Sequence, residues 1–147
     1  MILTVTLNAA IDKRYVVENY RVGEVNRVKE CAYVAGGKGL NVSKTAKIAG
    51  AEVLATGFAG GHAGEYIIEA VEAQGVETDF IKVKGESRSC INIYDPVNQT
   101  QTEFLEPGVT VNEAEQRAFY LKFAALIVKC DVVAMSGSVP KGIGTDM

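Results

Sequence analysis

Ala35-Gly36-Gly37-Lys38-Gly39-Leu40-Asn41-Val42-Ser43 places three glycines around one lysine, and a helical pattern follows. Glycine lacks a Cβ, so the backbone there can approach a ligand closely. Lys38 adds a positive charge that suits phosphate, and Asn41 lies about one helical turn later. The start of the helix offers unpaired N–H groups and the positive end of its dipole. The stretch therefore predicts a site for a small, anionic, hydroxylated molecule.

Apolar strands and helices alternate on both sides of this stretch, which is typical of a parallel α/β sheet. Asn112, with Glu115 three residues later, has the pattern of a helix capping box. Thr145 or Asp146 is a candidate cap for a further helix. The pattern predicts buried strands at 2–7, 53–58 and 131–135, a short strand at 80–83, and helices at 40–49, 64–74 and 112–129.

Four less apolar segments interrupt the alternation: 14–18, 28–34, 89–94 and 100–105. Their looser polar–apolar alternation suits a sheet with one wet face. We expect the four segments to pair into one small sheet that covers the site, although the two pairs lie far apart in the sequence. The side chains expected on its packed face are Phe104, Tyr33, Ile91 and Ile93.

Composition narrows the class of protein. The 147 residues are 48% hydrophobic and 22% charged, which is ordinary for a soluble globular domain. The net charge of −3, without a basic run, argues against nucleic acid or a membrane as the main partner. Three scattered cysteines and no signal-peptide or membrane-span pattern predict a cytoplasmic protein with reduced thiols.

Three further residues are candidates for ligand binding. Asp12 follows the first strand and can accept hydrogen bonds from sugar hydroxyls, although an aspartate there can also simply form a turn. Arg88 can hold a phosphate with two N–H groups, whereas a single arginine is more often a solvated surface charge. Ser138 lies in Ser136-Gly137-Ser138, which can form an anion-binding nest or a plain loop.

Several motifs together resemble the PfkB (ribokinase-like) carbohydrate kinase family. Lys38 and the segment Arg88-Ser89-Cys90-Ile91 are similar to its phosphosugar branch, the 1-phosphofructokinases and tagatose-6-phosphate kinases. Ala9 stands where that branch usually has proline. The resemblance implies a three-layer αβα core, here partial, with a small β-sheet lid near 14–34 and 89–106. The motifs that carry it are Asn8-Ala9-Ala10-Ile11-Asp12, the glycine-lysine stretch, Gly57-Phe58-Ala59-Gly60-Gly61 and Ser136-Gly137-Ser138-Val139-Pro140.

The same resemblance implies a reaction. A kinase of this branch transfers the γ-phosphate of ATP, with Mg²⁺, to a ketohexose monophosphate such as fructose 1-phosphate or tagatose 6-phosphate. Family members are longer, and the resemblance places their catalytic aspartate and most of the ATP site in a C-terminal half, beyond Met147. We therefore expect residues 1–147 to be an N-terminal portion that contains no catalytic residue, is inactive alone and forms a homodimer through the lid. The residues implied for substrate are Asp12, Gly37, Lys38, Asn41, Arg88 and Ser138.

Two other classes of protein remain as alternatives. One is a non-catalytic module that binds a sugar phosphate. The other is a dinucleotide-dependent oxidoreductase, which Gly37-Lys38-Gly39-Leu40-Asn41-Val42 disfavours because the third glycine of the fingerprint is missing. His62 is the only histidine, which disfavours a metal site or a Ser-His-Asp triad.

Overall fold

The core of the chain is a parallel β-sheet between two layers of helices. The structure is a computed structural model that describes residues 1–144, so the helix cap predicted at Thr145 or Asp146, like Met147 after it, lies outside the described residues. The sheet has the order β5-β4-β1-β9, and β6 also pairs with β4. Its strands are β1 (Ile2–Thr6), β4 (Val53–Ala59), β5 (Glu77–Thr78), β6 (Ile81–Lys82) and β9 (Val132–Met135).

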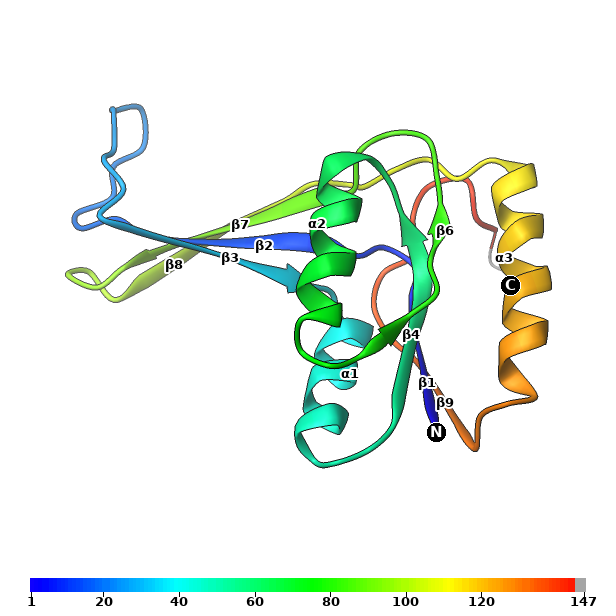
Figure 1. The fold of residues 1–147 in the computed structure, drawn as a ribbon. Helices are drawn as coiled ribbons and strands as arrows, with labels where there is room; N and C mark the ends of the chain where they lie inside the picture. Colours follow the sequence, from blue (N-terminus) through cyan, green and yellow to red (C-terminus); the bar gives the residue numbers. More distant parts are fainter. Residues whose placement is uncertain (145–147) are drawn as a thin grey trace.

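Helices cover both faces of this sheet. Helices α1 (Lys38–Ile48) and α2 (Gly61–Glu72) lie on one face, and α3 (Glu113–Ile127) lies on the other (Figure 1). The three-layer αβα arrangement predicted from the sequence is confirmed. None of the helices within residues 1–144 has the length and apolar character needed to cross a membrane.

Strand β1 shows how alternation produces the layers. Leu3 and Val5 belong to the apolar cluster that contains Phe119 of α3. Thr4 points to the other face, where its hydroxyl lies 2.6 Å from the Ser43 hydroxyl of α1. Because successive strand residues face opposite sides, one strand serves both helical layers.

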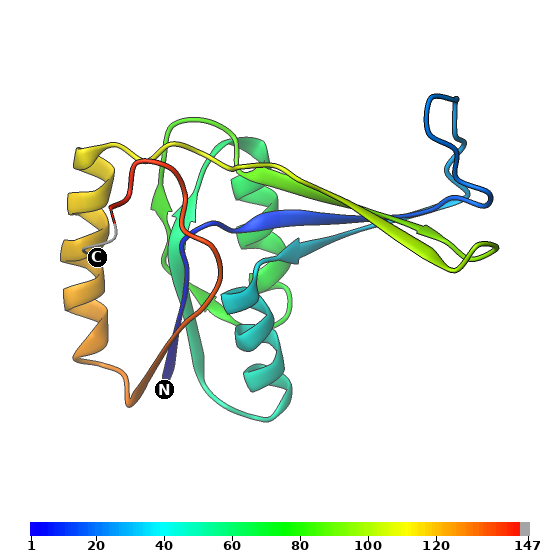
Figure 2. The ribbon, with the colours of Figure 1, turned by 180° about the vertical axis from the view of Figure 1, so that it is seen from behind.

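A second sheet extends from the core as a long arm (Figures 1 and 2). It consists of β2 (Ala10–Val16), β3 (Glu30–Gly36), β7 (Arg88–Asp95) and β8 (Thr100–Leu105), in the order β3-β2-β7-β8. Strands β2 and β7 pair in parallel, which joins two antiparallel hairpins into one sheet. The predicted pairing of four distant segments is therefore confirmed.

The register of the second sheet assigns its two faces. Lys13 lies opposite both Tyr33 and Ile91, and Ile91 lies opposite Phe104. Ile93 lies two residues after Ile91, so all four of the predicted apolar side chains share one face. The opposite face carries Asp12, Arg14, Val34, Cys90, Asn92, Glu103 and Leu105.

One buried carboxylate holds the tip of the second sheet together. Asp95 is 1% exposed and accepts backbone N–H bonds from Asn19 (3.2 Å), Tyr20 (2.7 Å), Val97 (3.0 Å) and Asn98 (3.2 Å). The side-chain amide of Asn98 adds a bond of 2.8 Å. Burial raises the pKa of Asp95, but these hydrogen bonds outweigh burial and hold the pKa well below its usual value.

Some element boundaries differ from the prediction. Helix α2 begins at Gly61 rather than at 64, because groups distant in sequence bind its first turn. The Glu86 carboxylate accepts from the Ala63 N–H, and the Ser87 hydroxyl accepts from the Gly60 N–H. Helix α1 begins at Lys38 rather than at 40. Strands β2 and β3 span 10–16 and 30–36 rather than 14–18 and 28–34, and the two-residue β5 was not predicted.

Candidate functional site

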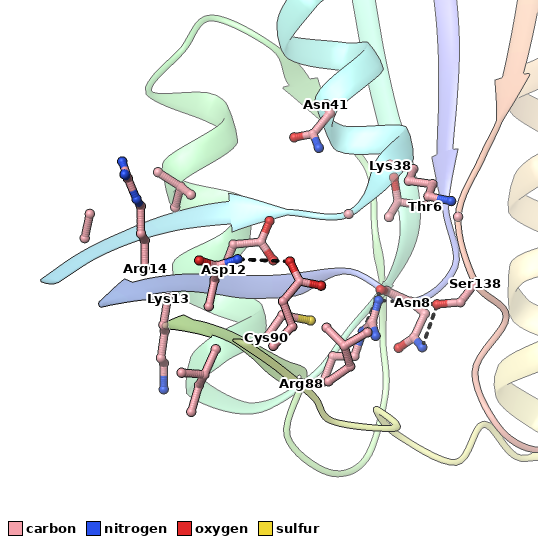
Figure 3. Close-up of a pocket in the computed structure, with 18 of the residues that line it drawn as sticks. Thr6, Asn8, Asp12, Lys13, Arg14, Lys38, Asn41, Arg88, Cys90 and Ser138 are labelled. Carbon is pink, nitrogen blue, oxygen red and sulfur yellow. Dashed lines mark hydrogen bonds between the residues drawn. The ribbon is translucent and has the colours of Figure 1, made fainter. Parts of the chain in front are cut away.

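A cavity of about 860 Å³ lies between the second sheet and the loops that follow β1 and β9 (Figure 3). The carboxyl ends of parallel strands are where open α/β sheets commonly bind ligands. The structure brings every predicted substrate-binding residue to this one cavity, whereas the catalytic aspartate expected beyond Met147 lies outside the described residues. The lining includes Asp12, Gly37, Lys38, Asn41, Arg88 and Ser138.

The Arg88 guanidinium is fixed at the edge of the cavity by three hydrogen bonds. Its Nε donates to the Asn8 carbonyl oxygen (3.2 Å), and its Nη1 donates to the Glu106 carbonyl oxygen (3.3 Å). Its Nη2 donates to the Ser138 hydroxyl oxygen (3.3 Å). The side chain is half-buried and anchored, so the alternative of a freely solvated arginine does not describe it.

Asn8 lies at the centre of these contacts, although the sequence analysis gave it no role. It is 7% exposed, and its Nδ2 donates to the Pro107 carbonyl oxygen and to the Ser138 hydroxyl oxygen, both at 3.2 Å. One signal was present in the sequence. Asn8 is a polar residue directly after an apolar strand, where the carboxyl end of that strand meets the cavity.

The glycine-lysine stretch forms the start of α1 at the cavity wall. Gly37 is the N-cap residue, and no side chain caps the helix there. The first N–H groups of the helix therefore have no partner within the helix. Gly39 packs directly on β1, where a Cβ would collide with Thr6 Oγ1 and with the Val5 carbonyl oxygen. This close packing brings the helix start, with Lys38 and Asn41, to the cavity.

Thr6 is an exception to the rule that buried polar groups are paired. Among the side chains of residues 1–144, the Thr6 hydroxyl is the one buried oxygen or nitrogen group that has no hydrogen-bond partner. Thr6 also lines the cavity beneath Gly37. The neighbouring Thr4, by contrast, is paired with Ser43.

Asp12 lines the cavity and, together with Glu103, gives it negative charge. Its pKa is raised above the usual value, first by burial and to a smaller extent by Glu103, while the charges of Lys44 and Arg88 oppose the rise. No hydrogen bond contributes to this shift. The carboxylate is therefore partly desolvated and still able to accept hydrogen bonds from a ligand.

Polar side chains of the second sheet extend the cavity beyond the predicted residues. The Asn92 amide donates to the Glu103 carboxylate (3.0 Å), and the Arg14 guanidinium lies 5.4 Å from the centre of the Tyr94 ring. The sequence analysis missed these residues because strand register, rather than local pattern, decides which side chains face the cavity.

The predicted apolar face lies mostly away from the cavity. Of Tyr33, Ile91, Ile93 and Phe104, only Ile91 is among the described residues that line it. Tyr33 and Phe104 are 48% and 51% exposed. The sequence left open whether this face would pack on a ligand or on a partner. The ligand alternative is not supported, because the register turns the polar face of the sheet toward the cavity instead.

Metal-binding groups do not gather in the part of the chain that is described. No group of three or more His, Cys, Asp or Glu side chains within residues 1–144 is arranged to hold a metal ion. The His62 side chain is fully exposed, and its Nδ1 lies 3.8 Å from Glu65 Oε2 on the same helix.

Comparisons with known proteins identify clear relatives. The sequence model described as "pfkB family carbohydrate kinase" matches residues 4–147, up to Met147 at the end of the sequence. A tagatose-6-phosphate kinase of Staphylococcus epidermidis is 43% identical over 146 residues, which are 99% of this chain and 46% of that protein. The chain thus spans about half the length of the curated relatives it matches.

Solved structures agree with the sequence relatives. A protein of Thermotoga maritima described as a possible 1-phosphofructokinase has a TM-score of 0.91 and 35% identity, covering 98% of this chain and 47% of that one. Phosphofructokinase-2 of Escherichia coli in complex with fructose-6-phosphate has a TM-score of 0.87 and 25% identity, covering 97% of this chain and 47% of that one. The fold is therefore ribokinase-like, as the sequence predicted.

Proposed function

The chain belongs to the pfkB family of carbohydrate kinases, and from this membership we propose that it supplies the sugar-recognition portion of an ATP-dependent phosphosugar kinase. The substrate is a ketohexose monophosphate, fructose 1-phosphate or tagatose 6-phosphate, and the product is a bisphosphate. Residues 1–147 form the N-terminal portion of the kinase domain, the second sheet is the lid over the sugar, and the catalytic aspartate belongs to the half beyond Met147.

One observation carries this proposal: a single cavity combines a fixed guanidinium with a carboxylate that is free to accept hydrogen bonds. Arg88 is anchored beside Ser138, while Asp12 lies along β2 on the lid side (Figure 3). A molecule with one phosphate and several hydroxyl groups satisfies both, because phosphate accepts from arginine and hydroxyls donate to a carboxylate.

The described residues divide the work of binding. Arg88, Ser138 and Lys38 hold the phosphate, with the first N–H groups of α1 adding positive potential. Asp12 and Asn41 orient the sugar ring through its hydroxyl groups, and the Gly37 backbone allows close approach. Held in this way, the sugar presents its acceptor hydroxyl in a fixed position, and such positioning is the main contribution that a protein makes to phosphoryl transfer.

ATP and Mg²⁺ are the cofactors we propose for the complete reaction. The described residues do not fit the metal, since they offer no cluster of acidic groups to hold it. The roles assigned to residues 1–144 are therefore limited to binding and orienting the sugar phosphate.

We also propose a homodimer that forms through the lid. The lid face with Tyr33, Ile93 and Phe104 presents apolar side chains outside the cavity, and such a face is typical of an interaction surface.

Three free cysteines agree with a cytoplasmic protein.

Calorimetric titration with fructose 1-phosphate, tagatose 6-phosphate and fructose tests recognition. We expect the phosphorylated sugars to bind more tightly, and Arg88→Ala to weaken them by about 10- to 100-fold, because a charge-assisted hydrogen bond contributes roughly 1.5–3 kcal/mol. Arg117→Ala, an exposed arginine of α3, is the matched control and should leave binding unchanged. No preference for the phosphorylated sugars would contradict the proposal.

A chimera tests catalysis. Residues 1–147 are fused to the remaining half of the Staphylococcus epidermidis tagatose-6-phosphate kinase, and ADP release is followed with each sugar phosphate. We expect transfer to at least one of them, and Arg88→Ala should raise the KM for the sugar without changing that for ATP. Phosphosugar binding by a folded chimera without any transfer would instead favour the non-catalytic binding module.

A further inference from the structure

Asn8 joins four segments that lie far apart in the sequence. Its own position follows β1, its carbonyl oxygen holds Arg88 at the start of β7, and its amide contacts Pro107 after β8 and Ser138 after β9. Because Asn8 is 7% exposed, these contacts replace solvent almost entirely.

The orientation of the Asn8 amide follows from its partners. The Pro107 carbonyl oxygen can only accept, so the amide nitrogen must face it. The same nitrogen lies 3.2 Å from Ser138 Oγ, so that this hydrogen bond runs from Asn8 to Ser138. Gly108, at φ +89°, packs against the amide oxygen, where any Cβ would collide with Asn8 Oδ1. The amide is therefore held from both sides.

The Ser138 hydroxyl consequently receives two donors. Asn8 Nδ2 lies at 3.2 Å and Arg88 Nη2 at 3.3 Å from its oxygen. A serine hydroxyl has two acceptor positions and one hydrogen to donate. With both acceptor positions occupied, its remaining capacity is to donate, and Ser138 is exposed at the cavity.

From this geometry we propose that Asn8 is a positioning residue that restricts the Ser138 hydroxyl to donating toward a bound phosphate. The inference rests on the proposed function, since it refines the phosphate-binding end of that site. Phosphate oxygens only accept, so they match a hydroxyl that can only donate. A ligand hydroxyl that must donate at this point finds no acceptor, and the site selects for the anion.

A double-mutant cycle tests this coupling. We expect Asn8→Ala to weaken fructose 1-phosphate binding by about tenfold and fructose binding by less than about twofold, since one charge-assisted hydrogen bond is misdirected. In a Ser138→Ala background, Asn8→Ala should change fructose 1-phosphate binding by less than about twofold, because its effect acts through the missing hydroxyl. Titrations followed by NMR give the affinities of both sugars.

A second variant reaches the Asn8 amide from outside the cavity. Gly108 is not among the residues that line the cavity, and Gly108→Ala should displace the amide and reproduce the selective loss of the phosphorylated sugar. Asn26→Ala, in the exposed loop at the tip of the second sheet, is the matched control and should leave the affinities for both sugars unchanged. Thermal unfolding of every variant checks that it is folded. If Asn8→Ala does not fold, the binding data for Gly108→Ala decide the test.

The outcomes separate this inference from the proposed function. Equal losses for fructose and fructose 1-phosphate, or additive effects in the cycle, would overturn the role of Asn8 while leaving the phosphosugar site in place. A wild-type chain that binds neither fructose 1-phosphate nor tagatose 6-phosphate more tightly than fructose would overturn both.

Discussion

The tip and the root of the second sheet each contain one aspartate, and the protein surrounds the two in opposite ways. At the tip, five hydrogen bonds reach the Asp95 carboxylate and hold its pKa well below the usual value. At the root, burial raises the pKa of Asp12, and no hydrogen bond contributes to that shift. The same residue type is satisfied by the fold in one place and left unsatisfied in the other.

This difference distinguishes a structural polar group from one that is available to a ligand. A buried carboxylate with a full set of donors stabilises the fold, because its ionised form is stabilised only in the native state. A partly desolvated carboxylate without donors costs stability until a ligand supplies them. A shortage of protein donors, rather than burial alone, therefore makes Asp12 the better candidate for ligand binding.

The largest effect is expected at the tip. Asp95→Ala removes the common acceptor of the segment that follows β2 and of the β7–β8 turn, and the Tm should fall by roughly 5–10 °C. Asp131→Ala, which breaks an exposed ion pair with the amino terminus, is the matched control and should change the Tm little. Calorimetric scans measure both. A Tm unchanged by Asp95→Ala would mean that the tip does not depend on this carboxylate.

At the root, we expect Asp12→Asn to lower the affinity for the ligand and to raise the stability of the fold. Sugar-phosphate affinity should fall by about 10- to 100-fold, because hydrogen bonds to a charged group contribute roughly 1.5–3 kcal/mol. The Tm should rise, because the variant no longer holds a partly buried charge. Titration and thermal unfolding of the same samples test both parts, and a variant that loses stability and affinity together would show that Asp12 is structural like Asp95.

The two aspartates should also give opposite responses to pH. The folded pKa of Asp95 is lowered, so its contribution to stability is complete above about pH 4 and is lost as the pH falls through the folded value. The folded pKa of Asp12 is raised, so its ionisation costs stability above about pH 4, and this cost disappears on acidification.

Thermal unfolding from pH 7 down to pH 3 measures this contrast. Wild type should exceed Asp95→Asn in Tm at pH 7 and fall below Asp12→Asn at the same pH, and both gaps should narrow toward pH 3. If the Asp12→Asn gap has the same sign as the Asp95→Asn gap at pH 7, the proposed contrast fails.

Strand β1 offers the same contrast between a paired and an unpaired polar group, and the smallest effect is expected there. Thr4→Val breaks a buried hydroxyl pair and should cost about 0.5–1.5 kcal/mol. Thr6→Val removes a hydroxyl without a partner and should be neutral or slightly stabilising. Urea unfolding of the two isosteric variants measures the difference. Equal destabilisation by both would show that the Thr6 hydroxyl has a partner in solution.

Local sequence predicted what depends on local chemistry. The capping box of Asn112 and Glu115 is present as predicted, because its two hydrogen bonds join residues three apart. The glycine-lysine stretch lies at the cavity, and the order of strands and helices gave the three layers. The predicted substrate-binding residues meet in one place because parallel strands bring their carboxyl ends to one edge.

The missed features depend on partners that are distant in the sequence. Helix α2 begins early because Glu86 and Ser87 cap it from more than twenty residues away. The role of Asn8 depends on Ser138, which is 130 residues later. Which face of the second sheet meets the cavity depends on register, since a shift of one residue reverses the face. No local pattern contains this information.

The contact between Asn8 and Ser138 also has a consequence for how the chain is made. Bringing together groups separated by 130 residues closes a long loop, and the entropy of that closure must be offset by packing of the whole core. A growing polypeptide on the ribosome contains Arg88 well before Ser138 is synthesised, so early intermediates lack the hydrogen bond between them. Under the proposed function, phosphate held by Arg88 and Ser138 therefore stabilises only molecules in which these distant parts of the chain have already come together.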